Sequence, residues 1–228
     1  MQSDKFFSEN MKLADLITTN YSLILMLPRF NIPLGFGEKS VKEICENNGI
    51  PVQFFLLICN VYTFDNYKPC HNHFGDMRML IPYLLASHTY YIQERIPHIE
   101  RHLKKIADKI DKKYGDVLKH FFSNYKNEVE EHFSYEEKIV FPYLNNLEKG
   151  TVNKQYTIKE FSTTHSNIED KLNDLIQIIF KYLPKNTFLN ESIELIFDIM
   201  QLSNDLKKHQ LIENKVLIPY VTVLEERL

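Results

Sequence analysis

The chain has 228 residues, of which 44% are hydrophobic and 13% aromatic, and its formal net charge is −3. This composition suits one sizeable globular core with a small second unit. With only six Gly and nine Pro, it favours a mostly helical chain. The charge gives no signal for binding a polyanion, and Asp108 and Asp111 interrupt the densest basic stretch, residues 101–113. We therefore expect no nucleic-acid partner.

Cysteine usage indicates the cellular compartment. Cys45, Cys59 and Cys70 cannot all pair with one another, and none belongs to a Cys-x-x-Cys motif. This usage is typical of a reducing compartment rather than of a disulfide scaffold. The N-terminus lacks the pattern of a signal peptide, and no apolar run reaches membrane-spanning length. We therefore expect a cytoplasmic protein with no membrane partner.

Residues 1–62 are predicted to form a small helical N-terminal domain, followed by a linker over residues 63–75. Ser40 and Glu43 have the spacing of a capping box, which opens a short helix. Pro51 suits the first turn of the next helix, because proline's missing N–H has no partner there in any case.

Residues 76–228 are predicted to form an up-down-up-down four-helix bundle, so the expected fold class is all-α. Apolar residues recur along four long segments at steps of three and four, or their sums. This spacing gives each helix one apolar face, as an antiparallel bundle requires. The four apolar stripes run over residues 81–110, 118–143, 158–179 and 195–224.

A twelve-residue pattern occurs twice and carries the chemistry. It reads His132-Phe-Ser-Tyr-Glu136-Glu-Lys138-Ile-Val-Phe-Pro142-Tyr143 in the first copy and His209-Gln-Leu-Ile-Glu213-Asn-Lys215-Val-Leu-Ile-Pro219-Tyr220 in the second. Residues four apart share a helix face, so each copy directs an imidazole and a carboxylate to one spot. Two such helices facing each other would form a metal site, and the two bridging-capable glutamates suggest two ions.

Four histidines lie on the apolar stripes, one per helix: His88, His132, His165 and His209. A single histidine on such a stripe is usually a core residue, but four at one level with two glutamates indicate ligands. A buried carboxylate without a compensating charge costs several kcal/mol. The repeated lysines, two positions beyond each glutamate, should point away. Ion pairing therefore does not explain the glutamates.

Three further carboxylates are candidates near the site. Glu169 follows His165 by four residues, so we expect it to be a seventh ligand, the alternative being a surface carboxylate. Glu128 and Asp205 each precede a ligand histidine by four residues and could orient its imidazole, or could simply be solvated.

The histidines outside the stripes are expected to be surface residues. His98 and His102 stand four apart on the first long helix, but His98 is off the stripe and His102 is far from His88 along the helix. His120 is expected to be exposed as well.

Donor chemistry indicates the metal. Mixed imidazole and carboxylate ligands, with two glutamates able to bridge, suit a pair of five- or six-coordinate irons better than tetrahedral zinc. Six or seven side chains do not saturate two such irons, so a position should remain for a small ligand. Apolar neighbours would exclude bulk water and larger substrates, and we expect these to be Tyr91, Ile92, Phe133, Ile168 and Ile212.

These residues resemble a known family. Residues 76–228 are similar to the hemerythrin-type (HHE) cation-binding domain, whose ligand positions match His88, His132, Glu136, His165, His209 and Glu213. The resemblance implies a non-haem di-iron centre. The segments 31–38 and 40–49 resemble the small N-terminal domain of the iron–sulfur cluster repair di-iron proteins. That second resemblance implies stress protection or cluster repair, with iron–sulfur proteins as partners.

Two departures from the repair family stand out. Its Cys-Cys pair is replaced here by Leu34-Gly35-Phe36-Gly37, which removes any thiol chemistry at that loop. Its additional ligand histidine beyond the proline of the first long helix corresponds to a position near Ile110, and Glu169 is the candidate substitute.

Three functions remain open from the sequence. The protein could be a redox or repair protein meeting dioxygen, peroxide or nitric oxide, a module that binds dioxygen or nitric oxide reversibly and signals to a partner, or an iron-storage or structural bundle. No nucleophile–base constellation, phosphate loop or dinucleotide fingerprint is present, which argues against hydrolase and kinase chemistry. The sequence leaves open whether the protein is an enzyme and whether it forms a homodimer.

Overall fold

The computed structural model describes residues 6–151, 156–164, 168, 170–183 and 189–228. The predicted fold class is confirmed: the chain is all-α, with a helical bundle and a small helical N-terminal part. The chain divides into two compact units. The first comprises Met1–Ser87, Leu144–Ser162 and Lys208–Leu228, and the second His88–Tyr143 and Thr163–Lys207. The predicted domain boundaries at residues 62 and 75 stay predictions.

The N-terminal part consists of short helices that belong to the first unit. They are α1 (Leu13–Thr19), η1 (Tyr21–Leu25), α2 (Met26–Arg29), α3 (Val41–Asn47), α4 (Val52–Thr63) and the turn η2 (His71–His73). The predicted capping box is confirmed, because Ser40 N–H donates to the Glu43 carboxylate at 2.8 Å and Glu43 N–H donates to Ser40 Oγ at 3.3 Å. Most of α4 is buried, so this helix forms the centre of the N-terminal core.

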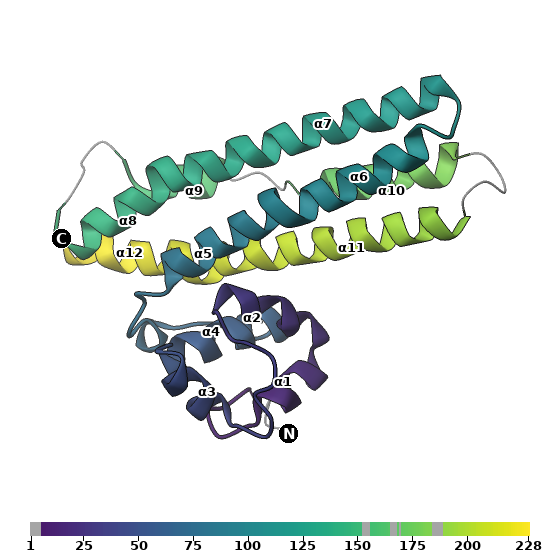
Figure 1. Cartoon of the computed structure of the whole chain (residues 1–228). Coiled ribbons are helices and arrows are strands. Elements are labelled where there is room, and N and C mark those ends of the chain that lie inside the picture. The colour runs from purple at the N-terminus through teal and green to yellow at the C-terminus, as the bar shows by residue number, and fades with distance from the viewer. Residues whose placement is uncertain (1–5, 152–155, 165–167, 169, 184–188) are drawn as a thin grey trace. The chain divides into compact units, whose positions relative to one another are not determined.

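The long helices are built from consecutive segments, and Figure 1 traces them in chain order. The first consists of α5 (Leu80–Thr89), η3 (Tyr90–Arg95) and α6 (Ile96–Ala107), and the second of α7 (Lys112–Tyr135), η4 (Glu136–Val140) and α8 (Phe141–Glu148). Next come α9 (Ile158–Thr164) and α10 (Asp170–Tyr182). The last consists of α11 (Leu189–Ile212), η5 (Glu213–Leu217) and α12 (Ile218–Arg227).

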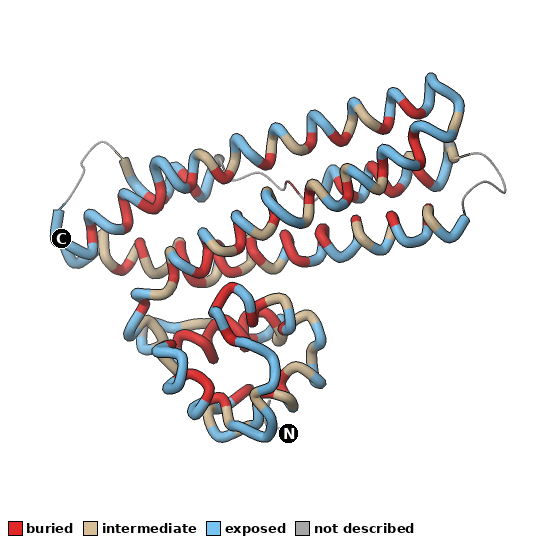
Figure 2. The backbone as a smooth tube through the Cα atoms, viewed as in Figure 1, coloured by how far each residue is buried: buried red, intermediate tan, exposed pale blue. Residues whose placement is uncertain are grey.

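The second unit has one apolar core, to which α6, α7, α10 and α11 all contribute. Leu103, Phe122, Leu172 and Ile199 represent the four helices in it, and each is at most 2% exposed. These helices lie alongside one another in Figure 1, and Figure 2 shows buried positions recurring along each of them. The predicted stripes therefore coincide with the buried faces in this unit.

Helix α7 begins earlier than the sequence pattern suggests. The predicted apolar stripe begins at residue 118, but the helix starts at Lys112, and Asp111 caps it by accepting from the Lys113 N–H at 3.0 Å. Gly115 lies within α7, at the point where α7 passes close to the end of α6. A Cβ at this position would stand 2.3 Å from the backbone oxygen of Ala107. Glycine is therefore required here for close packing.

The linker is hydrogen-bonded within the first unit to the segment that carries the second copy of the motif. Lys215 Nζ donates to the backbone oxygens of Asp65 at 3.0 Å and Tyr67 at 3.2 Å, and Lys208 Nζ lies 3.8 Å from the Asp65 carboxylate. Lys215 therefore turns toward the linker, as predicted for a residue that does not neutralise Glu213. Among the described residues, no helix has the length and apolar character needed to cross a membrane.

Candidate metal centre

In the part of the chain that the structure describes, three π-helical turns interrupt the long helices, each just before a proline: Pro97, Pro142 or Pro219. The residue preceding each proline donates its N–H to a carbonyl five residues back; the bonds run from Ile96 to Tyr91, from Phe141 to Glu136 and from Ile218 to Glu213. Proline lacks an N–H, and its ring clashes with the carbonyl four residues back, so the preceding turn widens. Such π-turns are frequent at functional sites.

The first copy of the motif forms a compact cluster of donors in the second unit. Nε2 of His132 lies 2.8 Å from Oε1 of Glu136, and Nε2 of His88 lies 3.1 Å from Oε2 of the same carboxylate. Glu136 is fully buried and His88 is 2% exposed. One buried carboxylate thus faces two imidazole nitrogens from different helices, α5 and α7.

The ring of His88 is held on both sides. Its Nδ1 lies 2.9 Å from Oε1 of Glu137, while its Nε2 faces Glu136. The ring stacks on Phe133 with centroids 3.9 Å apart and an interplanar angle of 10°. Tyr91 stacks on the same phenylalanine at 5.8 Å. Two consecutive carboxylates therefore bracket this imidazole, and the aromatic rings fix its plane.

The second copy of the motif repeats the geometry in the first unit. Nε2 of His209 lies 3.0 Å from Oε1 of Glu213, close to the corresponding distance in the first copy. Glu213 is fully buried and His209 is 2% exposed. Both glutamates begin a π-turn, so the repeated proline explains why the two copies share one backbone conformation.

The donor set fits a metal ion of the hard-to-borderline class. Two donors bound to one ion at about 2.1 Å stand roughly 3 Å apart when they are adjacent in the coordination shell. The imidazole–carboxylate separations of 2.8, 3.0 and 3.1 Å match this spacing. A cation would also offset the charge of carboxylates that are 0% exposed, which a neutral imidazole does not.

Comparison with protein-family models gives one match, described as the hemerythrin HHE cation binding domain, over residues 81–221. The match spans more than half of the chain, and it includes both copies of the motif and the helix of His88.

The chain belongs to the hemerythrin HHE cation-binding family.

No curated protein and no solved structure matches the chain. Family membership together with the buried histidine and glutamate side chains identifies this hemerythrin domain as metal-binding.

Two of the predicted ligands, His165 and Glu169, lie outside the described residues of the hemerythrin domain. Their ligand roles therefore stay predictions. Ile168 between them is buried. The bounds α9 (Ile158–Thr164) and α10 (Asp170–Tyr182) place both positions between two described helices.

The two carboxylates proposed to orient histidines have different surroundings. Glu128 pairs with Lys171 and is 43% exposed, so the surface alternative holds for it. Asp205 is 2% exposed, and its backbone oxygen accepts a hydrogen bond from the Tyr91 hydroxyl at 3.2 Å. This bond joins the helix of His209 to the π-turn η3.

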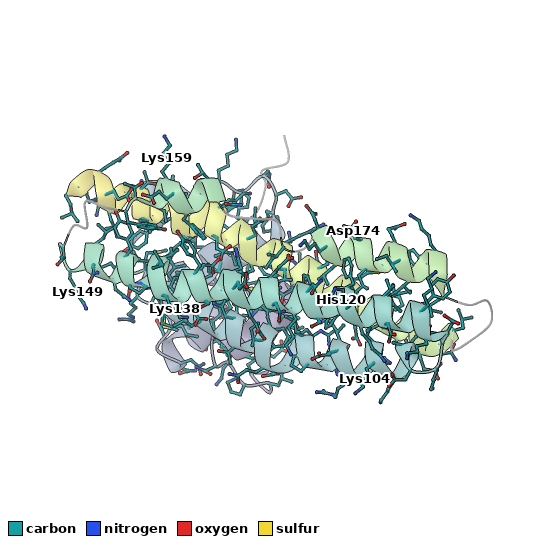
Figure 3. The ribbon with its side chains drawn as sticks, turned by 90° about the horizontal axis from the view of Figure 1, so that it is seen from above. Lys104, His120, Lys138, Lys149, Lys159 and Asp174 are labelled. Carbon is teal, nitrogen blue, oxygen red and sulfur yellow. The ribbon has the colours of Figure 1, made fainter. Side chains whose placement is uncertain are left out.

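Glu137 is a functional candidate that the sequence pattern did not reveal. Its contact with His88 joins residues 49 positions apart, and the second copy of the motif has Asn214 at the equivalent place. A carboxylate that accepts from the far nitrogen of a ligand histidine is the usual partner in metal sites. The adjacent glutamate pair in the first copy was the available signal. Figure 3 marks neighbouring Lys138, which is exposed as predicted.

Proposed function

We propose that this hemerythrin domain holds two irons and reacts with dioxygen, peroxide or nitric oxide. The observation that carries the proposal is a pair of fully buried glutamates within a cation-binding family, each beginning a π-turn and each in contact with the histidine four residues before it. Glu136 and Glu213 are proposed to bridge the two ions. The full proposed ligand set is His88, His132, Glu136, His165, Glu169, His209 and Glu213.

The composition of this set favours a small reacting partner. Seven side chains, two of them bridging, provide fewer donors than two six-coordinate irons accept, so a solvent molecule or a diatomic ligand completes the shell. Bound iron would supply a reversible one-electron change and an affinity for such gases. Tyr91, Phe133 and Ile212 are at most 2% exposed and would keep bulk water and organic substrates away from the ions.

The proposed physiological role is protection against oxidative and nitrosative stress, including repair of iron–sulfur clusters, with iron–sulfur proteins as partners. Thiol chemistry in the N-terminal part does not contribute to this role. Burial raises the pKa of the Cys45 thiol to about 12, and burial also raises that of Cys59, so both stay protonated and unreactive. All three cysteines are free, which supports a cytoplasmic location.

The decisive experiment uses iron-loaded protein that has been reduced under anaerobic conditions. We expect a new visible absorption band on exposure to dioxygen or nitric oxide, because a small ligand would enter the iron coordination shell. Metal-free protein treated in the same way is the control. An iron-loaded sample whose visible absorption spectrum changes with neither gas would contradict the proposal and leave storage or structure as the function.

A reversible sensing role is the second candidate, and the linker contacts favour it. Lys215 stands two residues after Glu213 and donates to the linker carbonyls of Asp65 and Tyr67. A change in metal ligation at Glu213 could therefore reach the N-terminal part through one helical turn. Catalytic consumption of dioxygen, peroxide or nitric oxide over many turnovers would support the reactive role, whereas one gas molecule bound and released per centre would support sensing.

Substitution of Glu137 tests the proposed environment of His88. We expect Glu137→Ala to weaken metal binding by about 10–100-fold, as is typical for loss of the carboxylate behind a ligand histidine. Glu137→Gln should have a smaller effect, because its amide oxygen can still accept from Nδ1. Equilibrium dialysis against a chelator series measures the affinity. Glu131→Ala, an exposed carboxylate on α7, is the matched control, and equal affinities for all variants would exclude a role for Glu137.

A further inference from the structure

A second group of potential metal ligands lies in the second unit, on α6 and α11. Nε2 of His98 stands 3.1 Å from Oδ2 of Asp198, and Nδ1 of His102 stands 3.3 Å from the same oxygen. The two histidines are four residues apart on α6, so their rings project from one helix face. Asp198 comes from α11, and the three ligand atoms all lie within 4.8 Å of one another.

The aspartate of this group is held in place by Arg95. Nη2 of Arg95 donates to Oδ1 of Asp198 at 2.8 Å, which leaves Oδ2 directed toward the two imidazoles. Partial burial acts to raise the pKa of Asp198, but the Arg95 charge and the hydrogen bonds from His102 and Arg95 outweigh it and lower that pKa. The carboxyl group is therefore ionised and oriented at neutral pH.

The outer nitrogen of His102 also has a carboxylate nearby. Nε2 of His102 lies 3.8 Å from Oε2 of Glu194, while its Nδ1 faces Asp198. At 3.8 Å this is an ion-pair approach and not a hydrogen bond, so Glu194 adds negative charge near His102 without fixing its ring. The side chains of His102 and Asp198 are 19% and 20% exposed, so the group is half-buried rather than spread over the surface.

We propose that His98, His102 and Asp198 form a second metal site, separate from the di-iron centre, for a divalent cation of the zinc class. Two imidazoles and one carboxylate are the ligand types that zinc and its neighbours prefer, and two histidines at i and i+4 with one carboxylate are a recurrent zinc-binding set. In a tetrahedral shell with bonds of about 2.0–2.1 Å, ligand atoms stand roughly 3.3 Å apart. The two nitrogen–oxygen separations, 3.1 and 3.3 Å, meet this requirement.

The site is accessible to a hydrated ion. His98 is half-exposed, and a surface hollow of about 490 Å³, lined in part by Arg95 and His98, opens beside it. Three protein ligands leave the fourth tetrahedral position to water or to a small anion. Because the ligands come from α6 and α11, a bound ion would also join these two helices.

Zinc binding to the full-length protein tests the proposal. We expect His98→Gln and His102→Gln each to weaken binding of one zinc equivalent by more than about tenfold. Loss of a residue that only hydrogen-bonds to a ligand typically costs at least that much affinity, and loss of the ligand itself should cost more. Zinc should raise the melting temperature of the parent protein through this site and should do so less in the two variants. The matched control is His120→Gln, which replaces an exposed histidine on α7 that Figure 3 marks. Isothermal titration and metal analysis measure affinity and stoichiometry.

Two further measurements separate this site from the di-iron centre and from folding defects. Glu136→Gln combined with Glu213→Gln should retain the zinc equivalent, because neither residue belongs to the second site. In the unsubstituted protein, zinc should protect His98 and His102, but not His120, from modification by diethyl pyrocarbonate. If His98→Gln and His102→Gln bind zinc as the parent does, or if zinc protects neither histidine, the proposed site does not exist.

Discussion

Replacing Glu136 with glutamine is expected to reduce the metal content of the iron-reconstituted protein from two ions per chain to one or none. Glu136 is fully buried and faces the imidazoles of both His88 and His132. The substitution removes the charge that we propose to bridge the two ions, while it preserves the shape of the side chain. Glu213→Gln should have the same effect, because Glu213 has the corresponding place in the second copy. Metal analysis after removal of loosely bound iron measures the change.

The stability of the two states should respond differently to the same substitution. In the loaded protein, weaker binding lowers the melting temperature, because a ligand that binds only the folded state stabilises it. In the metal-free protein, Glu136→Gln removes a buried charge, so the variant should be at least as stable as the parent. A purely structural glutamate would lose stability in both states. Glu131→Gln, at an exposed position of α7, is the control and should change neither state.

Glu169→Ala is a further variant for the same metal analysis, and a partial loss of metal is expected for it. Glu169 is proposed to bind only one of the two ions. Its loss should therefore leave one metal tightly bound and make the other labile. Retention of both metals with an unchanged spectrum would show that Glu169 is a surface carboxylate. One tightly bound ion per chain in the parent, kept in Glu213→Gln, would contradict the two-metal proposal as a whole.

Gly115→Ala is expected to destabilise the fold by about 1–3 kcal/mol, the usual cost of forcing extra atoms into a packed core. At an ordinary interior helix position, the same substitution would stabilise by roughly 1 kcal/mol, because alanine has the higher helix propensity. Here the added Cβ would stand 2.3 Å from the backbone oxygen of Ala107, and a backbone atom cannot rotate away. The clash therefore outweighs the propensity, and the sign of the effect reverses.

Urea denaturation of the metal-loaded protein measures this effect as a lower free energy of unfolding. Gly75→Ala is the control, since a Cβ there has no neighbour within 4 Å and this glycine is exposed. Its stability should stay within about 0.5 kcal/mol of the parent, as for most surface substitutions. A Gly115→Ala variant more stable than the parent would show that α6 and α7 do not approach as closely as described.

Local sequence patterns predicted the fold class, a helix cap and the His–Glu contacts of the repeated motif. The all-α class followed from the apolar stripes, and the capping box of Ser40 and Glu43 from two residues three apart. The contact between His132 and Glu136, like that between His209 and Glu213, follows from the four-residue spacing of one helical face. Such interactions lie within about one turn of a single helix, so the helical period alone determines them.

Other features depended on which helices meet and at what level. Glu137 reaches His88 across two helices, and Asp198 reaches His98 and His102 from about 100 residues away. His102 was expected to be a surface residue but is half-buried for this reason. The sequence shows that each of these side chains can bind protons or metals, but not which of them meet.

The sequence by itself therefore determined the helices, their buried faces and the two His–Glu pairs, because the energies involved are local and periodic. Tertiary structure decided the carboxylate behind His88, the glycine between α6 and α7, and the second group of histidines with Asp198. These depend on the axial register between neighbouring helices. The packing of the whole apolar core sets that register, since a shift of one turn would move every side chain by about 5.4 Å.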